Sequence, residues 1–369
     1  MTADHASVPA PAGAQAAGVR EGLWGALQAG DEYAAAAVVF AAIDAGMSAE
    51  DVLLDVIAPV QAKVGTEWAA NRMTVAQEHT ATAINERVIA GLSHQPGAPA
   101  EATLGRITVA CVDGEWHALP ARLLAETLRL RGWRVDFLGA QVPTLHLIEH
   151  LHTTGPDAVA LSSSIPTRLP TAHATITACQ AAGVPVLAGG AAFGSDGRFA
   201  RLLGVDVWAP DARAAADRLA HEMPRTSLAG THQAVDDLPH LADQEYTLIT
   251  QSRPQLVKQT MAELEATYPP MRAYTDAQRQ HTAEDMAHIV DFLASALYTD
   301  DRELFTGFLS WTGEILAARG VPADSLTPAL GLLAGQLSDF PRATRFLSGP
   351  HGHGDGLEAV IPSPSGGRV

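Results

Sequence analysis

Residues 107–120, ITVACVDGEWHALP, decide the fold, because a short apolar run passes there into a turn that carries a single histidine. Four more short apolar runs follow, at residues 134–139, 157–162, 185–190 and 205–210. Segments with a helical pattern separate them, at residues 119–132, 143–154, 168–182 and 193–203. This alternation is typical of a doubly wound parallel sheet, whose ligands lie beyond the carboxyl ends of the strands. We therefore expect a Rossmann-like (flavodoxin-like) α/β domain over residues 104–222.

The segments on either side of this domain have a purely helical pattern. Residues 19–93 predict a four-helix bundle, in which Ser48, with Asp51 three positions later, begins a long helix. Residues 244–349 predict a second helical domain. The remaining segments are rich in alanine, proline, glycine or serine, so we expect 1–18 and 350–369 to be disordered and 223–243 to be a linker.

The charge balance narrows the range of functions. The chain of 369 residues has 24 basic and 41 acidic side chains and a net charge of -17, and its lysines are Lys63 and Lys258. Because nucleic acids are polyanions, this balance argues against direct nucleic-acid binding and against an anionic membrane surface. The two cysteines, Cys111 and Cys179, exclude a disulfide scaffold and a four-thiolate metal site.

The hydropathy pattern bears on location. No run approaches the roughly 20 apolar residues that a membrane span needs. The first residues lack the basic segment followed by an apolar run that is typical of a secretory signal. We therefore expect a cytoplasmic protein.

The turn after the first predicted strand is the first candidate site. Glu115-Trp116-His117 lies where an α/β sheet places its ligand, although His117 could also be a helix-capping or a surface histidine. The turn lacks G-x-G-x-x-G, so a dinucleotide site is disfavoured. Two other strand ends are unusual: the third ends in serines 162–164, and the fourth ends in Gly189-Gly190, where a large group could approach the backbone.

Together, these three strand ends resemble the cobalamin-binding domain of methionine synthases and corrinoid proteins. The resemblance implies that His117 displaces the dimethylbenzimidazole base and ligates cobalt from below, while Glu115 orients its imidazole. It also implies a slot for the displaced base, lined by Ser162, Ser164, Gly189 and Gly190. Two residues depart from the family pattern: Pro120 replaces a glycine and Ser164 replaces a leucine.

The predicted bundle carries a second motif. Trp68 is followed after nine residues by Glu78-His79, with Val75 between them. A core tryptophan and a solvated Glu-His pair would explain these residues, but they also resemble the W-x9-EH signature of light-sensing adenosylcobalamin proteins. That resemblance implies that Trp68 and Val75 cover the adenosyl group and that Glu78 contacts its ribose. Because Ala69 stands where those photosensors have a histidine, His79 is the nearest candidate to ligate cobalt after photolysis.

The C-terminal helical domain carries a looser pattern, with Asp285 and His288 one helical turn apart. The full candidate set is Arg272, Tyr274, Arg279, His281, Asp285 and His288. A solvated helix face with i,i+3 pairs would explain it. The order of domains also resembles the photocobilins, which implies a globin-like domain that binds biliverdin. Because no cysteine follows Cys179, such a bilin would be bound noncovalently.

An apolar stripe in the same domain supports a different interpretation. Phe305, Phe308, Leu309 and Trp311 would suit a dimerisation or partner-docking surface.

These observations favour a light sensor over an enzyme. Photolysis of the Co–C bond of adenosylcobalamin would change the packing of the domains or the assembly, with output through a partner protein and a light-dependent homo-oligomer. The acidic charge argues against a light-responsive DNA repressor that acts alone. The alternatives are a corrinoid methyl-carrier subunit of a methyltransferase system and a regulator that responds to the level of cobalamin.

Overall fold

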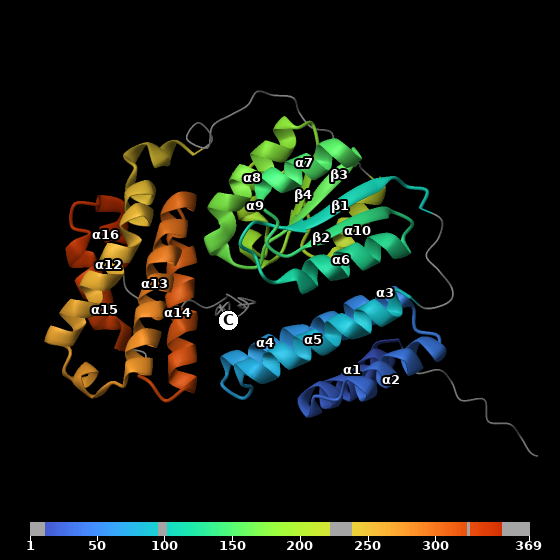
Figure 1. The fold of residues 1–369 in the computed structure, drawn as a ribbon, viewed down its shortest axis with the longest axis horizontal. Helices are drawn as coiled ribbons and strands as arrows, with labels where there is room; N and C mark the ends of the chain where they lie inside the picture. Colours follow the sequence, from blue (N-terminus) through green and yellow to red (C-terminus); the bar gives the residue numbers. More distant parts are fainter. Residues whose placement is uncertain (1–11, 95–101, 222–237, 323–324, 349–369) are drawn as a thin grey trace, which may run out of the picture.

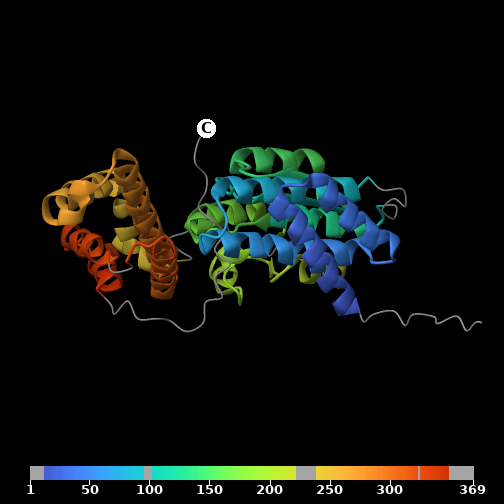
Figure 2. The same cartoon turned by 90° about the horizontal axis from the view of Figure 1, so that it is seen from below.

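The computed structural model describes residues 12–94, 102–221, 238–322 and 325–348, which form a helical bundle, an α/β domain and a C-terminal helical domain (Figure 1). The bundle lies along one side of the α/β domain, and the C-terminal helices lie at one end of both (Figures 1 and 2). The expected segment 350–369 and most of the expected linker are outside the described residues.

The α/β domain contains a five-stranded parallel sheet in the order β2-β1-β3-β4-β5. The strands are β1 (Arg106–Cys111), β2 (Arg134–Gly139), β3 (Ala158–Ser162), β4 (Val186–Gly189) and β5 (Val207–Trp208). The register pairs Cys111 with Ser162 and Ser162 with Gly189, so these carboxyl ends meet at one edge. The predicted doubly wound parallel sheet is confirmed.

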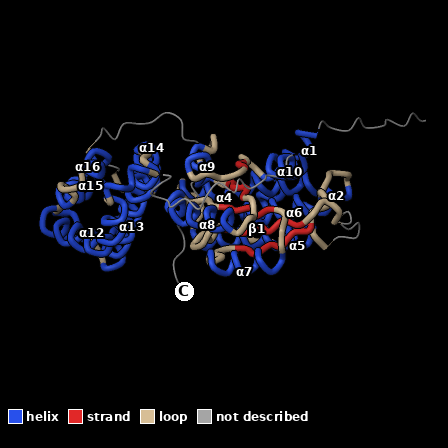
Figure 3. The backbone as a smooth tube through the Cα atoms, turned by 90° about the horizontal axis from the view of Figure 1, so that it is seen from above, coloured by secondary structure: helices blue, strands red, loops and turns tan. Residues whose placement is uncertain are grey.

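Helices cover both faces of this sheet (Figure 3). They are α6 (Ala118–Leu130), α7 (Thr144–Thr154), α8 (Leu169–Ala181), α9 (Arg198–Leu202) and α10 (Ala212–His221). Helices α6 and α10 pack together on one face, where Ile107, Val109 and Leu128 are buried. Helices α7 and α8 pack on the other face, where the core contains Ala110 and Val159. The opposite burial of neighbouring β1 residues follows from the two-residue period of a strand.

The bundle consists of α1 (Ala12–Ala29), α2 (Glu32–Asp44), the long helix Ala49–Ala69 and α5 (Val75–Leu92). The long helix contains α3 (Ala49–Asp51), a π-helical segment (Val52–Ile57) and α4 (Ala58–Ala69). Its first turn is capped as expected, because Ser48 Oγ accepts a hydrogen bond from Asp51 N at 3.1 Å.

The expected disorder of residues 1–18 is wrong for its last part, since α1 already begins at Ala12. Alanine has the highest helix propensity, and Ala16 contacts the bundle core with 7% of its surface exposed. The segment therefore has both an intrinsic preference for helix and a surface to bury.

The C-terminal domain is helical, as predicted. It contains α12 (Glu245–Thr267), α13 (Asp276–Thr299), α14 (Arg302–Ala318), α15 (Leu326–Gln336) and α16 (Pro341–Leu347). The linker was expected to extend through residue 243, but the C-terminal domain begins earlier. A 3-10 turn at Pro239–Asp243 already packs on this domain. Leu238 and Leu241 are buried there, which gives the segment an apolar anchor. Among the described helices, none is long and apolar enough to cross a membrane.

Candidate functional site

A cavity of about 1140 Å³ lies where the three domains meet. Its floor comes from the turns at the carboxyl ends of the strands, its roof from α4 and α5, and one side from α14. Pockets for drug-sized molecules measure about 300–1,000 Å³, so this cavity can accept a large ligand. The lining includes Ala58, Gln61, Ala62, Gly65, Ala69, Glu78, His79, Thr82, Glu86, Trp116, His117, Ser164, Gly190, Asp211, Arg213, Trp311, Glu314, Ile315 and Ala318.

On the floor, a buried carboxylate fixes the imidazole of His117. Glu115 is 0% exposed, and its Oε1 lies 2.6 Å from His117 Nδ1 and accepts from the His117 backbone N–H at 2.9 Å. Its Oε2 accepts from the backbone N–H groups of Ser164 and Ile165 at 2.6 and 3.1 Å. Sequence analysis did not predict that the serine strand end would hold this carboxylate, because only the fold brings residues 115 and 164 together.

These contacts decide the charge of Glu115. Burial alone would raise its pKa, but the His117 imidazole and the backbone N–H donors outweigh that effect and lower the pKa to about 2. The carboxylate therefore stays ionised, which holds His117 in one orientation beside the cavity.

At the end of β4, the backbone passes so close to Ser163 that only glycine fits at position 190. Gly190 has φ +101°, and a Cβ there would lie 2.3 Å from the Ser163 carbonyl oxygen. Of the four predicted slot residues, Ser164 and Gly190 line the cavity. Ser162 and Gly189 pair with each other at the ends of β3 and β4, two positions before Ser164 and one position before Gly190.

Small side chains form much of the roof. Ala58, Ala62, Gly65 and Ala69 of α4 line the cavity at intervals of three or four residues, so they share one helix face. This face leaves room for a flat ligand between the roof and the floor.

A chain of hydrogen bonds joins α4 to α5 beside this face. Asn85 Nδ2 donates to Gln61 Oε1 at 2.8 Å, and Gln61 Nε2 donates to Thr82 Oγ1 at 2.7 Å. Thr82 Oγ1 then donates to Glu78 Oε1 at 3.1 Å, while Glu78 Oε2 lies 2.5 Å from His79 Nδ1. Each donor points toward Glu78, so this relay orients its carboxylate at the cavity wall.

The structure separates the predicted W-x9-EH residues. Glu78 and His79 line the cavity, whereas Trp68 and Val75 are not among its lining residues. Trp68 is 8% exposed, with the Arg319 guanidinium 5.1 Å from its ring centroid, and Val75 is 47% exposed. On the helix, Trp68 lies beside the row of small residues, which turns its indole toward the C-terminal domain.

Some lining residues were missed by sequence analysis. Trp116 stands between Glu115 and His117, lines the cavity and is 59% exposed, so its place in the turn could have indicated it. Arg213 and Asp55 join the bundle to the α/β domain at 3.0 Å, and both line the cavity. On α14, sequence analysis assigned Trp311 to a dimerisation or partner-docking surface and not to this cavity, because α14 belongs to a separate domain.

The six residues predicted for a bilin do not line this cavity. Arg279 pairs with Glu265 at 2.8 Å, and His281 Nδ1 lies 3.3 Å from Glu284. Burial raises the pKa of Asp285, although the nearby histidines, His288 foremost, oppose that shift. Arg272 is exposed, whereas Tyr274 and His288 are half-buried.

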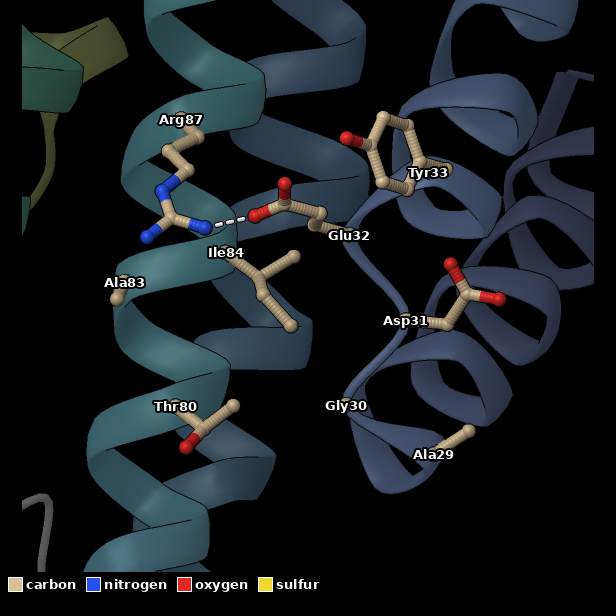
Figure 4. A pocket seen from close by; sticks show the side chains of 9 residues that line it. All are labelled: Ala29, Gly30, Asp31, Glu32, Tyr33, Thr80, Ala83, Ile84 and Arg87. Atoms are coloured by element: carbon tan, nitrogen blue, oxygen red, sulfur yellow. Dashed lines mark hydrogen bonds and ion pairs between the residues drawn. The ribbon is translucent and has the colours of Figure 1, made fainter.

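A second hollow, of about 450 Å³, lies between the α1–α2 turn and α5 (Figure 4). Arg87 and Glu32 form an ion pair across it, and Tyr33 is 81% exposed at its edge. Its lining contains none of the residues predicted to bind a cofactor.

Comparisons with known proteins identify the two domains that enclose most of the large cavity. Residues 105–220 match a B12 binding domain family, and residues 19–92 match a second B12 binding domain family. These segments are B12-binding domains, so the predicted cobalamin-binding fold with its helical cap is confirmed, and cobalamin is the cofactor class.

Among curated proteins, the chain is similar to the HTH-type transcriptional repressors CarH and CarA of Myxococcus xanthus. It is 34% identical to CarH over 162 residues, which are 42% of this chain and 52% of CarH. It is 38% identical to CarA over 95 residues, which are 25% of this chain and 31% of CarA. The chain therefore spans about half the length of CarH and about a third of CarA.

Among solved structures, the chain is similar to the Methanosarcina barkeri monomethylamine corrinoid protein. The TM-score is 0.46 at 19% identity, over 56% of this chain and 98% of that protein.

The residues of the cavity fit a corrinoid. An oriented imidazole faces it, Gly190 lines it without a side chain, and the volume suits a macrocycle. The lining includes the acidic residues Asp55, Glu78, Glu86, Asp211 and Glu314. Carboxylates accept hydrogen bonds, and the edge of a corrin ring carries amide donors.

Proposed function

We propose that this protein is a light sensor, not an enzyme, and that its cofactor is adenosylcobalamin. The observation that carries the proposal is one cavity with His117 on its floor and the Glu78-His79 pair in its roof. Adenosylcobalamin supplies a corrin ring that absorbs visible light and a weak Co–C bond that the absorbed light can break. The similarity to CarH and CarA supports a sensor, since both are named as regulators.

On the lower side, His117 would ligate cobalt through Nε2, because Glu115 holds Nδ1. Ser162, Ser164, Gly189 and Gly190 would line the slot for the displaced base. Ser164 and Gly190 already line the cavity, and Ser162 pairs with Gly189 next to them, which supports this assignment.

On the upper side, Glu78 would accept hydrogen bonds from the ribose hydroxyls. His79 would take the upper cobalt position once light has removed the adenosyl group. Trp68 and Val75 would cover the adenosyl group after a shift of the roof, since Trp68 lies at the edge of the small-residue face. The bundle would then move relative to the α/β domain and alter an assembly of protomers or a partner contact.

An absorption spectrum of the cobalamin-loaded protein, in the dark and after green light, tests this function. We expect a histidine-ligated adenosylcobalamin spectrum that changes on illumination. His117→Ala should lose the histidine-bound form, whereas His146→Ala, at an exposed position on α7, should not. An unchanged spectrum in His117→Ala would contradict the assignment of His117 as a cobalt ligand. Equal affinity for methylcobalamin and adenosylcobalamin would favour the corrinoid methyl carrier instead.

We also propose that the C-terminal domain is a globin-like domain that binds biliverdin noncovalently. The supporting observation is the half-buried Asp285, whose charge interacts with His281 and His288. A carboxylate can accept hydrogen bonds from pyrrole N–H groups, and arginines such as Arg272 and Arg279 can pair with propionates.

Coexpression with haem oxygenase tests the bilin. We expect a red or far-red absorption band that survives gel filtration of the full chain and is stripped by acid. Asp285→Asn should weaken this band, and Asp276→Asn, in the first turn of the same helix, should leave it unchanged. If the full chain takes up no biliverdin at micromolar concentrations, the domain is better interpreted as an interaction module.

A further inference from the structure

Helix α14 contacts both of the domains between which the cavity lies. Near its first residue, Arg198 of the α/β domain pairs with Asp301 at 3.3 Å and with Glu303 at 2.9 Å. At its last residue, the Ala318 carbonyl oxygen accepts a hydrogen bond from Asn71 Nδ2 at 3.4 Å. The helix therefore spans the side of the gap between the bundle and the α/β domain (Figure 1).

The half of α14 that adjoins the bundle also lines the cavity. Trp311, Glu314, Ile315 and Ala318 are spaced by one, three or four residues and lie along one side of the helix. Glu314 is exposed and lines the cavity, whereas Trp311 is 8% exposed and belongs to the apolar core.

An aromatic chain connects this wall to the interior of the C-terminal domain. The Trp311 ring centroid lies 6.3 Å from that of Phe308, and Phe308 stacks on Phe292 at 3.8 Å. A ligand that contacts Trp311 would therefore contact a rigid part of this domain, because packed aromatic rings adjust only in discrete steps.

We propose that the C-terminal domain is a third part of the cobalamin site, with α14 contacting the upper-face group of the bound cofactor. Glu314 accepts a hydrogen bond from a hydroxyl or amide of the ligand, and Trp311 and Ile315 cover its apolar surface. The upper face is assigned because the lining half of α14 is tethered to the roof, whereas its contact with Arg198 is at the opposite end. This inference rests on the proposed function.

Binding measurements with the full chain test the proposal. We expect Glu314→Ala to weaken adenosylcobalamin binding about tenfold, the loss typical of one hydrogen bond to a charged acceptor. The affinity of the same variant for hydroxocobalamin, which lacks the adenosyl group, should fall by less than about threefold. Glu263→Ala is the matched control, since this exposed acid lies on α12.

Hydrogen exchange of the unmutated protein gives an independent readout. Adenosylcobalamin should protect the backbone amides of residues 311–318 more than hydroxocobalamin does. The inference would be overturned if the two cobalamins protected residues 311–318 equally and if Glu314→Ala and Glu263→Ala bound adenosylcobalamin equally well. Cobalamin binding itself would then still stand. Failure of the unmutated chain to bind any cobalamin would instead overturn the proposed function.

Discussion

At the scale of single residues, Glu115 is the group on which the floor of the site depends. It is fully buried, yet it accepts hydrogen bonds on both carboxylate oxygens, which keeps its charge. The resemblance of the E-x-H turn to cobalamin-binding domains predicted this pair from the sequence. The partners from the strand-three end could not be predicted in the same way, since they lie about 50 positions away and no local pattern joins them.

Glu115 should make stability depend on pH. Its pKa falls from 4.5 to about 2 on folding, so its contribution is fully present above pH 4.5 and is lost as the pH falls toward 2. We expect Glu115→Gln to lower the free energy of unfolding by about a few kcal/mol near pH 7. This loss should become smaller as the pH falls below 4.5. Urea unfolding at a series of pH values measures this, with exposed Glu149→Gln as the control. If the unmutated protein and Glu115→Gln differed by the same unfolding free energy from pH 7 down to about pH 3, the prediction would be contradicted.

At the scale of elements, the roof depends on the pairing of α4 with α5. Helix α5 begins at a capping box between Thr74 and Gln77. The sequence predicted Glu78 and His79 as site residues. It did not predict the orientation of Trp68, because a motif gives spacing along the chain and not the face that a neighbouring domain covers.

The relay from Asn85 to Glu78 gives a sharp test of this roof. Thr82→Val keeps the shape of the side chain but removes the hydroxyl that links Gln61 to Glu78. We expect a loss of about 1–2 kcal/mol in unfolding free energy and a three- to tenfold weaker affinity for adenosylcobalamin. Thr80→Val is the control, because its hydroxyl donates only to the Ala76 carbonyl. Matching affinities in the two variants would show that the relay does not position Glu78.

At the scale of the whole molecule, three domains meet at one cavity and ion pairs hold two of them together. Arg131 contacts Glu50 through two nitrogens, at 2.7 and 2.9 Å, and Arg213 contacts Asp55 at 3.0 Å. The layout of a bundle, an α/β domain and a helical domain could be predicted from hydrophobic periodicity. The meeting of α14 with the cavity could not, because its lining residues are roughly 100 or more positions from all the others and share no local pattern with them.

Illumination should change the assembly of the adenosylcobalamin-loaded protein. Loss of the adenosyl group would leave a void beneath the roof, and packed domains respond by moving between discrete arrangements. We expect the elution volume in size exclusion to differ between dark and light. Protein loaded with hydroxocobalamin, which has no adenosyl group to lose, is the control. Identical elution with photolysis confirmed by absorbance would refute the prediction.

The position of α14 also has a consequence for the speed of exchange. A helix fastened at one end to the α/β domain and at the other to the bundle stands in the path of a large molecule that enters from that side. Entry and escape on that side then require α14 to detach, so both rate constants fall together while their ratio, the equilibrium affinity, is preserved. If the protein is the light sensor proposed above, slow exchange would keep its chromophore in place in the dark. Its response would then report absorbed light instead of the concentration of free cofactor.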